Sequence, residues 1–221
     1  YGGDSSQGTL GGITYGSFLE PRDLGSSGGA SHTDGFGGDG GGAIFINVSG
    51  LLVLNGSILS QGELNTSGAG YGVPGGSGGS IYILANTLIG NGTLNASGGV
   101  ATGISQQGGS GGGGRIALYY TTGSFDGNGS VRSGNSTAPG RRGSAGTFVT
   151  LSGPNYENIT IFSGNISLNG TYQSVTVDGN ESALTIEAGK TLNMTKLVLS
   201  KGNVSNLGNL SVAHEILVDD G

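Results

Sequence analysis

Apolar residues recur at every second position along much of this chain, which is the period of a strand with one buried face. Ile44, Ile46 and Val48 follow this pattern, as do Leu192 and Met194. No window keeps apolar residues at the three-to-four spacing of a helix for three turns, and glycine interrupts every candidate helix. The pattern therefore predicts an all-β protein.

A repeat of about 36 residues runs through the first two thirds of the chain. Each copy has a glycine cluster, an apolar strand and an Asn-Gly turn that leads into a second strand. The three copies comprise Gly37–Gly42, Ala43–Ile46 and Asn55–Ser60, then Gly75–Gly79, Ser80–Ile83 and Asn91–Ala96, then Gly108–Gly114, Arg115–Leu118 and Asn128–Ser133. Such self-similarity indicates stacked repeats, in which each unit buries its apolar face against its neighbours.

Beyond about Thr147 the glycine clusters stop and short strand patterns follow more closely. Val175, Leu197 and Ile216 are corresponding positions about 20 residues apart, which suits one turn of a parallel β-solenoid. The expected strands are Ile159–Phe162, Ile166–Leu168, Val175–Val177, Leu184–Ile186, Leu192–Met194, Leu197–Leu199, Leu210–Val212 and Ile216–Val218. A β-sandwich of hairpins is the alternative fold, because its strands also come with turns every 8 to 12 residues.

The repeat favours a parallel β-helix, or β-solenoid, over the sandwich. We expect an initial segment at residues 1–36, glycine-rich solenoid repeats at 37–146 and plainer coils at 147–221, in one continuous domain. The glycine clusters have two interpretations: loops that project from the solenoid, or polyproline-II-like segments that pack side by side. The general behaviour of glycine-rich segments favours loops.

Composition excludes several classes of function. The chain of 221 residues has no cysteine, so disulfides and cysteine nucleophiles are excluded. Its eight Lys and Arg residues are spread along the chain, which argues against a nucleic-acid partner. No apolar run is long enough for a membrane span. Only 10% of the residues are charged, so we expect something other than ionised side chains to keep the surface hydrated.

The strongest chemical signal is an excess of Asn-X-Ser/Thr triplets, the acceptor motif for N-glycosylation. Serine and threonine make up about a fifth of the chain, so by chance roughly one asparagine in five has a serine or threonine two positions later. Of the 17 asparagines, 14 open such a triplet: Asn47, Asn55, Asn65, Asn91, Asn95, Asn128, Asn135, Asn158, Asn165, Asn169, Asn180, Asn193, Asn203 and Asn209. We call these the acceptor asparagines and expect them to carry glycans.

Turn chemistry alone does not explain these triplets. Four acceptor asparagines precede glycine, a strong turn signal, but turns do not require a hydroxyl residue two positions later. On a strand, residues two apart face the same way, and the middle residue of many triplets, such as Ile166 or Met194, belongs to the apolar set. Asparagine and hydroxyl should therefore point outward together, and glycosylation in turn implies an extracellular or cell-surface protein.

Other candidate chemistry is weaker, and we assign no catalytic, cofactor-binding or metal-binding residue. Solvated loop acids account for Asp178, Glu181 and Glu187, the most closely grouped carboxylates. The segment Asp34–Phe45 matches a calcium-binding repeat only in part. His32 and His214 have no partner in the sequence, and Tyr15, Tyr119 and Tyr120 could stack on sugars but more often cap a core.

Four stretches of the chain carry a resemblance to a known family: Tyr15–Gly29, Gly75–Ile83, Gly92–Gly98 and Gly111–Tyr120. The chain resembles glycine-rich, right-handed parallel β-helix surface proteins, which are modules of large exported proteins. The resemblance covers roughly residues 10 to 120 and implies a fold and an exterior location rather than an activity. The density of acceptor triplets departs from the family pattern and implies a glycan-coated version.

No polar helix follows the strand pattern Ile216–Val218 in the sequence, so we expect an open sheet edge that another copy covers. Contacts of this head-to-tail kind generate filaments. The sequence thus predicts a non-enzymatic structural subunit of a heavily N-glycosylated extracellular fibre or surface layer, with copies of itself and covalent glycans as partners and no cofactor. The alternatives are a carbohydrate-binding adhesin module and a polysaccharide-active β-helix enzyme.

Overall fold

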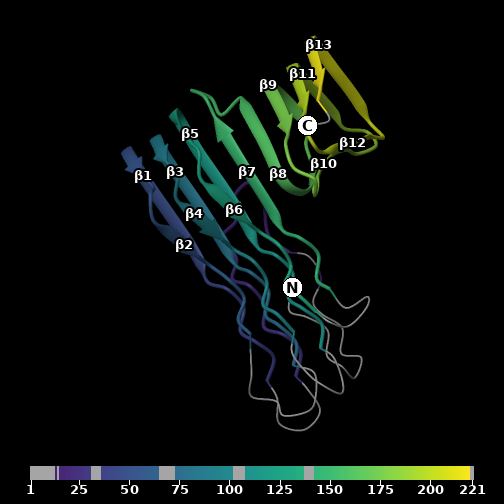
Figure 1. Ribbon diagram of the computed structural model, residues 1–221. Helices are drawn as coiled ribbons and strands as arrows, with labels where there is room; N and C mark the ends of the chain where they lie inside the picture. The colour runs from purple at the N-terminus through teal and green to yellow at the C-terminus, as the bar shows by residue number, and fades with distance from the viewer. Residues whose placement is uncertain are drawn as a thin grey trace.

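The computed structural model describes residues 13, 15–30, 36–64, 73–101, 108–136 and 142–219, and in these residues the protein is all-β (Figure 1). Thirteen strands form a ten-stranded sheet and a three-stranded sheet. Nowhere in these ranges is there a helix that is long and apolar enough to cross a membrane. The all-β prediction is confirmed.

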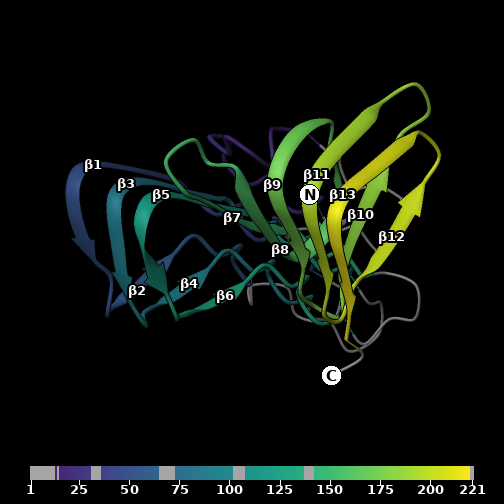
Figure 2. The ribbon, with the colours of Figure 1, turned by 90° about the horizontal axis from the view of Figure 1, so that it is seen from above.

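Most of the strands belong to one continuous sheet. In spatial order its main path comprises β1 (Ala43–Val53), β3 (Ser80–Gly90), β5 (Arg115–Phe125), β7 (Thr147–Ser152), β8 (Asn158–Ser167), β9 (Gly170–Val177), β11 (Thr191–Leu199) and β13 (Asn209–Val218). Two further strands, β10 (Ser182–Ile186) and β12 (Asn203–Asn206), branch from the end of β8. The smaller sheet consists of β2 (Ser57–Leu59), β4 (Thr93–Asn95) and β6 (Asn128–Ser130), which line up beneath β1, β3 and β5 in Figure 2.

Corresponding positions of the sequence repeats lie side by side on neighbouring parallel strands. Ile44 of β1 pairs with Ile81 of β3, and Ile81 pairs with Ile116 of β5. Further along the chain, Leu197 pairs with both Val175 and Ile216. The alignment of these positions from the sequence is therefore confirmed, and successive repeats stack one strand apart.

Several expected short strands are parts of longer ones. Leu192–Met194 and Leu197–Leu199 are two ends of β11, and the pairing of β11 with β13 shifts in register between Met194 and Lys196. A register shift of this kind changes which residues face the core, so it divides one strand into two alternating patterns in the sequence. The prediction of two separate strands in this region was wrong for that reason.

One pair of strands breaks the parallel pattern. Among the strand pairs of the described residues, only β7 and β8 run antiparallel, and the turn between them contains Gly153 and Pro154. Gly153 has φ +97°, and Tyr156 has φ 55°, a left-handed conformation that is uncommon for a residue with a side chain. The alternating pattern did not predict this reversal, although Gly-Pro is a turn signal. A sandwich of hairpins requires antiparallel neighbours throughout, which the other pairs do not provide.

The reversal bears on the expected division of the chain at residue 147. Thr147 begins β7, which still pairs in parallel with β5, and the direction changes only after Ser152. The three segments 1–36, 37–146 and 147–221 remain a prediction.

The glycine clusters pack against one another through backbone hydrogen bonds, so the loop interpretation was wrong for the described glycine segments. The amides of Gly75 and Gly78 donate to the carbonyls of Gly109 and Gly112 in the next cluster, at 3.0 and 2.9 Å. The amides of Gly76 and Gly79 donate in a different direction, to Glu63 and Ser60, at 3.2 and 2.8 Å. Residues three apart thus face the same neighbour, as in a polyproline-II helix with three residues per turn.

This packing leaves no room for side chains. A Cβ atom on Gly111 would lie 1.8 Å from the carbonyl oxygen of Gly76, and one on Gly76 would lie 2.0 Å from that of Asp39. A Cβ atom on Gly50 of β1, by contrast, would meet nothing within 4 Å. Glycine is therefore required in the packed layer because neighbouring backbones touch there.

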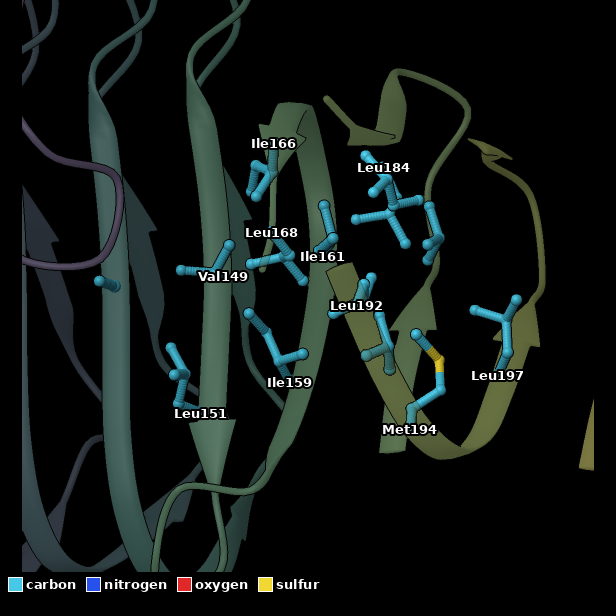
Figure 3. Packing of buried hydrophobic residues seen from close by; sticks show 14 of the residues in the cluster. Val149, Leu151, Ile159, Ile161, Ile166, Leu168, Leu184, Leu192, Met194 and Leu197 are labelled. Carbon is cyan, nitrogen blue, oxygen red and sulfur yellow. The ribbon is translucent and has the colours of Figure 1, made fainter. Parts of the chain in front are cut away.

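Two apolar clusters fill the interior. The first lies between strands β3 and β5 of the large sheet and the small sheet and includes Ile81, Ile116 and Leu94. The second includes Ile161, Leu184 and many others contributed by β7 to β11, and Figure 3 shows these side chains pointing toward one another between the strands. Ile81, Ile116, Leu94, Ile161 and Leu184 are all fully buried, which explains how a chain so rich in glycine sustains a core.

Candidate glycan-acceptor surface

The acceptor asparagines lie at the surface of the molecule. Asn65 lies outside the described residues; of the other 13, Asn95 and Asn158 are half-buried. The remaining 11 are exposed: Asn47, Asn55, Asn91, Asn128, Asn135, Asn165, Asn169, Asn180, Asn193, Asn203 and Asn209. No described acceptor asparagine is buried, so each of the 13 has part of its surface in contact with solvent.

Strand alternation explains this exposure. The middle residues of the triplets on strands face inward: Ile166 and Met194 are buried, and Val204 is half-buried. The asparagine and the hydroxyl residue on either side of each therefore share the outer face. The triplet at Asn180 is different, because it lies in a turn and its Ser182 is buried, with Oγ donating to the carbonyl of Gly179 at 2.6 Å.

Acceptor asparagines on β11 and β13, and Asn169 directly before β9, are staggered along the sheet. Asn193 on β11 lies opposite Thr171 on one side and Ser211 on the other. Asn209 on β13 lies opposite Thr191. Acceptor asparagines on these neighbouring strands thus face hydroxyl residues rather than one another.

The shorter strands of this region keep a similar separation. Asn165 of β8 and Asn203 of β12 both pair with Ala183 of β10, so a whole strand lies between them. The hydroxyl of Thr185, also on β10, donates to Oδ1 of Asn165 at 2.8 Å. That bond uses the carboxamide oxygen. It does not involve the carboxamide nitrogen, which is the atom that would carry a glycan.

In the small sheet the acceptors are arranged less evenly. Ser57 pairs with Thr93, so Asn55 and Asn91, each two residues earlier, lie side by side. The backbone amide of Asn91 donates to Oδ1 of Asn55, with N and O 3.4 Å apart. Asn128 pairs with Thr93 rather than with the position of Asn91, so the alignment of the third repeat that we made from the sequence was two residues off at this point.

The two half-buried acceptors make more local hydrogen bonds. Oδ1 of Asn95 accepts from the backbone amide of Ser97 at 2.9 Å. Oδ1 of Asn158 accepts from the hydroxyl of Ser174 at 2.7 Å, and its Nδ2 donates to the carbonyl of Ser152 at 3.4 Å. Asn158 thereby links β8 to both of its neighbours, so its carboxamide also has a structural role.

Charged groups are sparse on this surface. In the part of the chain that the structure describes, the one ion pair joins Lys196 and Glu215, with Nζ and Oε2 2.9 Å apart. The described ranges contain no group of three or more His, Asp or Glu side chains arranged to hold a metal ion, and Asp178, Glu181 and Glu187 do not form one. His214 is exposed, whereas His32 and Asp34 lie outside the described residues.

The tyrosines that could stack on sugars are largely engaged in packing. Tyr119 contacts Tyr82 and Tyr156 edge-on, with ring centroids 5.6 and 5.1 Å away. Burial raises the pKa of the Tyr119 hydroxyl, and the nearby Tyr82 and Glu20 add to the effect. Burial also raises the pKa of Tyr120, a half-buried side chain packed against the first core cluster.

Residues 15–30, the described segment before the first repeat, pack over part of this row of rings. The guanidinium of Arg22 lies over the ring of Phe45, 4.2 Å from its centroid, and 5.1 Å from that of Tyr82. Phe18 and Leu19 pack against the second core cluster. The segment therefore covers the rings of Phe45 and Tyr82.

A cleft of about 230 Å³ lies between this segment and the glycine layer. Its polar side chains mainly hold the segment in place: Nη2 of Arg115 donates to the carbonyl of Tyr15 at 2.9 Å, and Oγ of Ser80 donates to that of Asp23 at 2.6 Å. Thr147 lines the cleft, but its Oγ1 is buried and without a hydrogen-bond partner. Asp23 is the one carboxylate among the described residues that line the cleft.

Comparison of the chain with protein-family models, with curated proteins and with solved structures finds no match. The resemblance to glycine-rich surface β-helices therefore stays a prediction. Function has to be argued from the chain's own residues, above all from its acceptor asparagines.

Proposed function

We propose that this protein is a structural subunit of an N-glycosylated extracellular fibre or surface layer, assembled head to tail. The observation that carries the proposal is the exposure of the acceptor asparagines, none of which is buried among the 13 that the structure describes. A glycan needs an asparagine with solvent around it and a hydroxyl residue on the same face. The strands supply both at most of these positions.

The fold within this proposal is a parallel β-solenoid with stacked coils. The parallel pairing of equivalent residues, such as Ile44 with Ile81 and Ile81 with Ile116, supports it. The packed glycine segments add a third side to each of the first coils, beside the large and small sheets. A rigid rod of this kind buries its apolar residues between coils and leaves its flanks for glycans.

Glycans would also account for the low surface charge. Only 10% of residues are charged, and sugars would supply the hydration that ionised side chains usually provide. N-glycosylation takes place on secreted and surface proteins, so the proposed location is outside the cell.

The two outer strands of the large sheet support assembly. Among the described residues, β1 pairs only with β3, and β13 pairs only with β11. Val53 on β1 is 52% exposed, and Ile216 on β13 is 58% exposed. Unpaired edges with apolar side chains are templates for pairing with another chain.

Strand direction fits such a contact. Because the single reversal lies between β7 and β8, β1 and β13 run in opposite directions. Copies stacked without rotation would bring β13 of one against β1 of the next as an antiparallel pair. The β7–β8 pair already shows this kind of junction within the chain.

An assembly assay with edge variants tests the proposal. Lysine on an outer strand opposes edge pairing, so Val53→Lys and Ile216→Lys should each abolish filaments or arrays seen by electron microscopy. Ile89→Lys is the matched control, because Ile89 pairs directly with Val53 but lies on the interior strand β3. Assembly that survives both edge variants, or that fails equally with the control, would contradict the edge-to-edge model.

The adhesin and the polysaccharide-active enzyme remain the alternatives. A glycan-array screen that finds a specific sugar ligand would favour the adhesin, whose candidate residues are Tyr15, Tyr119 and Tyr120. Polysaccharide cleavage that is lost when Asp178, Glu181 or Glu187 is changed to the amide or to alanine would favour the enzyme. Neither result is expected for a structural subunit.

A further inference from the structure

Two of the acceptor asparagines, Asn55 and Asn91, lie directly side by side on neighbouring turns. Asn55 and Asn91 begin equivalent turns in successive repeats, and the strands that follow them pair Ser57 with Thr93. Neighbouring strands are about 4.8 Å apart, and side chains directly opposite have Cβ atoms roughly 5 Å apart. A pyranose ring with its hydroxyl groups is wider than this spacing.

The carboxamide of Asn55 already occupies the space over the next turn. Its Oδ1 accepts the backbone amide of Asn91 at 3.4 Å. The same oxygen would lie 2.8 Å from a Cβ atom on Gly90, which has φ +122°. The side chain of Asn55 therefore leans along the stack toward Asn91 rather than straight out into solvent.

Other acceptors avoid this conflict. Asn193 lies opposite Thr171 and Ser211, and the acceptor Asn209 on the next strand is offset by two residues. In the small sheet, Asn128 lies opposite Thr93, two residues away from the turn that holds Asn91. Unlike these described acceptors, Asn55 and Asn91 are directly adjacent.

We infer that Asn55 and Asn91 form a single effective glycosylation site, so that a folded molecule carries a glycan on one or the other but not on both. The inference rests on the proposed function, which supplies the glycans. Both asparagines are exposed, so each is accessible when the other is unmodified. The first glycan then covers the neighbouring carboxamide and excludes a second.

The chain itself offers a direct count of glycans at this pair. No lysine or arginine lies between Arg22 and Arg115, so trypsin releases Asp23–Arg115 as one fragment. In a variant with Asn47, Asn65 and Asn95 changed to glutamine, that fragment keeps only Asn55 and Asn91 as acceptors. Mass spectrometry of the fragment from secreted, folded protein then reports molecules with no, one or two glycans.

We expect fragments with no or one glycan and a complete loss of the doubly modified form. Adding Asn55→Gln should raise the fraction of molecules that carry a glycan on Asn91. Asn169→Gln is the control. It should leave the fraction of molecules with a glycan on Asn193 unchanged, because Asn169 and Asn193 are staggered by two residues. Abundant doubly modified fragments in folded protein would overturn the inference while supporting the proposed function. Absence of glycans from this fragment and from every other acceptor would instead contradict the proposed function itself.

Discussion

Packing of the glycine layer can be tested with one methyl group. Gly111 lies in the middle of the layer, where its amide donates to the carbonyl of Gly99 at 3.0 Å and its carbonyl accepts from Gly134 at 2.9 Å. In Gly111→Ala, the new Cβ atom would start 1.8 Å from the carbonyl oxygen of Gly76. Ordinary contacts of a Cβ atom begin near 3.4 Å, so backbone on one side or the other has to move.

The expected loss of stability follows from that movement. The carbonyl of Gly76 also accepts the amide of Gly99 at 2.7 Å, so displacing it strains a second hydrogen bond. Overpacking typically costs about 1–3 kcal/mol, and each weakened hydrogen bond adds about 1 kcal/mol. We expect a loss of about 3 kcal/mol in the free energy of unfolding, which lowers Tm by roughly 6–12 °C in a chain of this size.

Gly50→Ala is the matched control. A Cβ atom there would have no neighbour within 4 Å, so the change should alter the free energy of unfolding by no more than about 1 kcal/mol. Urea unfolding followed by circular dichroism, together with calorimetric Tm values, compares the two variants. Equal unfolding midpoints for Gly111→Ala and Gly50→Ala would refute the packed layer and restore the interpretation of these glycines as loops.

Three further predictions concern the core and the surface. Leu184→Ala, at a fully buried position, should lower the free energy of unfolding by about 2–5 kcal/mol in the same urea assay, and a loss below 1 kcal/mol would contradict the packing around it. Lys196→Ala should change that free energy by less than about 1 kcal/mol, because both partners of its ion pair with Glu215 are solvent-exposed by about 40%. Burial raises the pKa of Tyr119 in the folded protein, so the unfolded chain releases this proton first as pH rises above about 10. Stability should therefore fall in that range, and Tyr119→Phe should make the fall shallower; an unchanged pH profile would contradict this assignment.

Periodicity along the chain was enough to predict the pairing of matching apolar positions in the large sheet. Strand residues alternate between core and surface, so matching apolar positions such as Val175, Leu197 and Ile216 predict the register that the structure shows. The same alternation predicted that asparagine and hydroxyl residues would share the outer face. Their exposure in the structure follows from the inward position of residues such as Ile166 and Met194.

Two features could not be predicted from the same patterns. Packed polyproline-II segments and projecting glycine loops have the same composition, so the sequence Gly75–Gly79 does not distinguish between them. The hydrogen bonds from this segment to Gly109 and Glu63 identify the packed form. The reversal at Gly153 resembles the other turns in sequence, because strand direction depends on how the following strand docks. The stagger of Asn128 went unnoticed because the triplets of successive repeats look alike.

The arrangement of acceptors has a consequence for the outer surface. Glycans on staggered sites such as Asn193 and Asn209 would lie over the hydroxyl residues of adjacent strands, including Thr171 and Thr191. Sugars and side chains would then form one hydrogen-bonding layer on the flank of the sheet. In the proposed assembly, exposed apolar residues of the outer strands, such as Val53 on β1 and Ile216 on β13, would lie at the contact between copies.

Electron cryo-microscopy of the native assembly tests the central claim most directly. The account predicts branched density on most of the exposed acceptor asparagines and a neighbouring copy whose β1 pairs antiparallel with β13. It also predicts density on only one of Asn55 and Asn91 in each subunit. Bare asparagines on an isolated molecule, with β1 and β13 free of any partner, would contradict it.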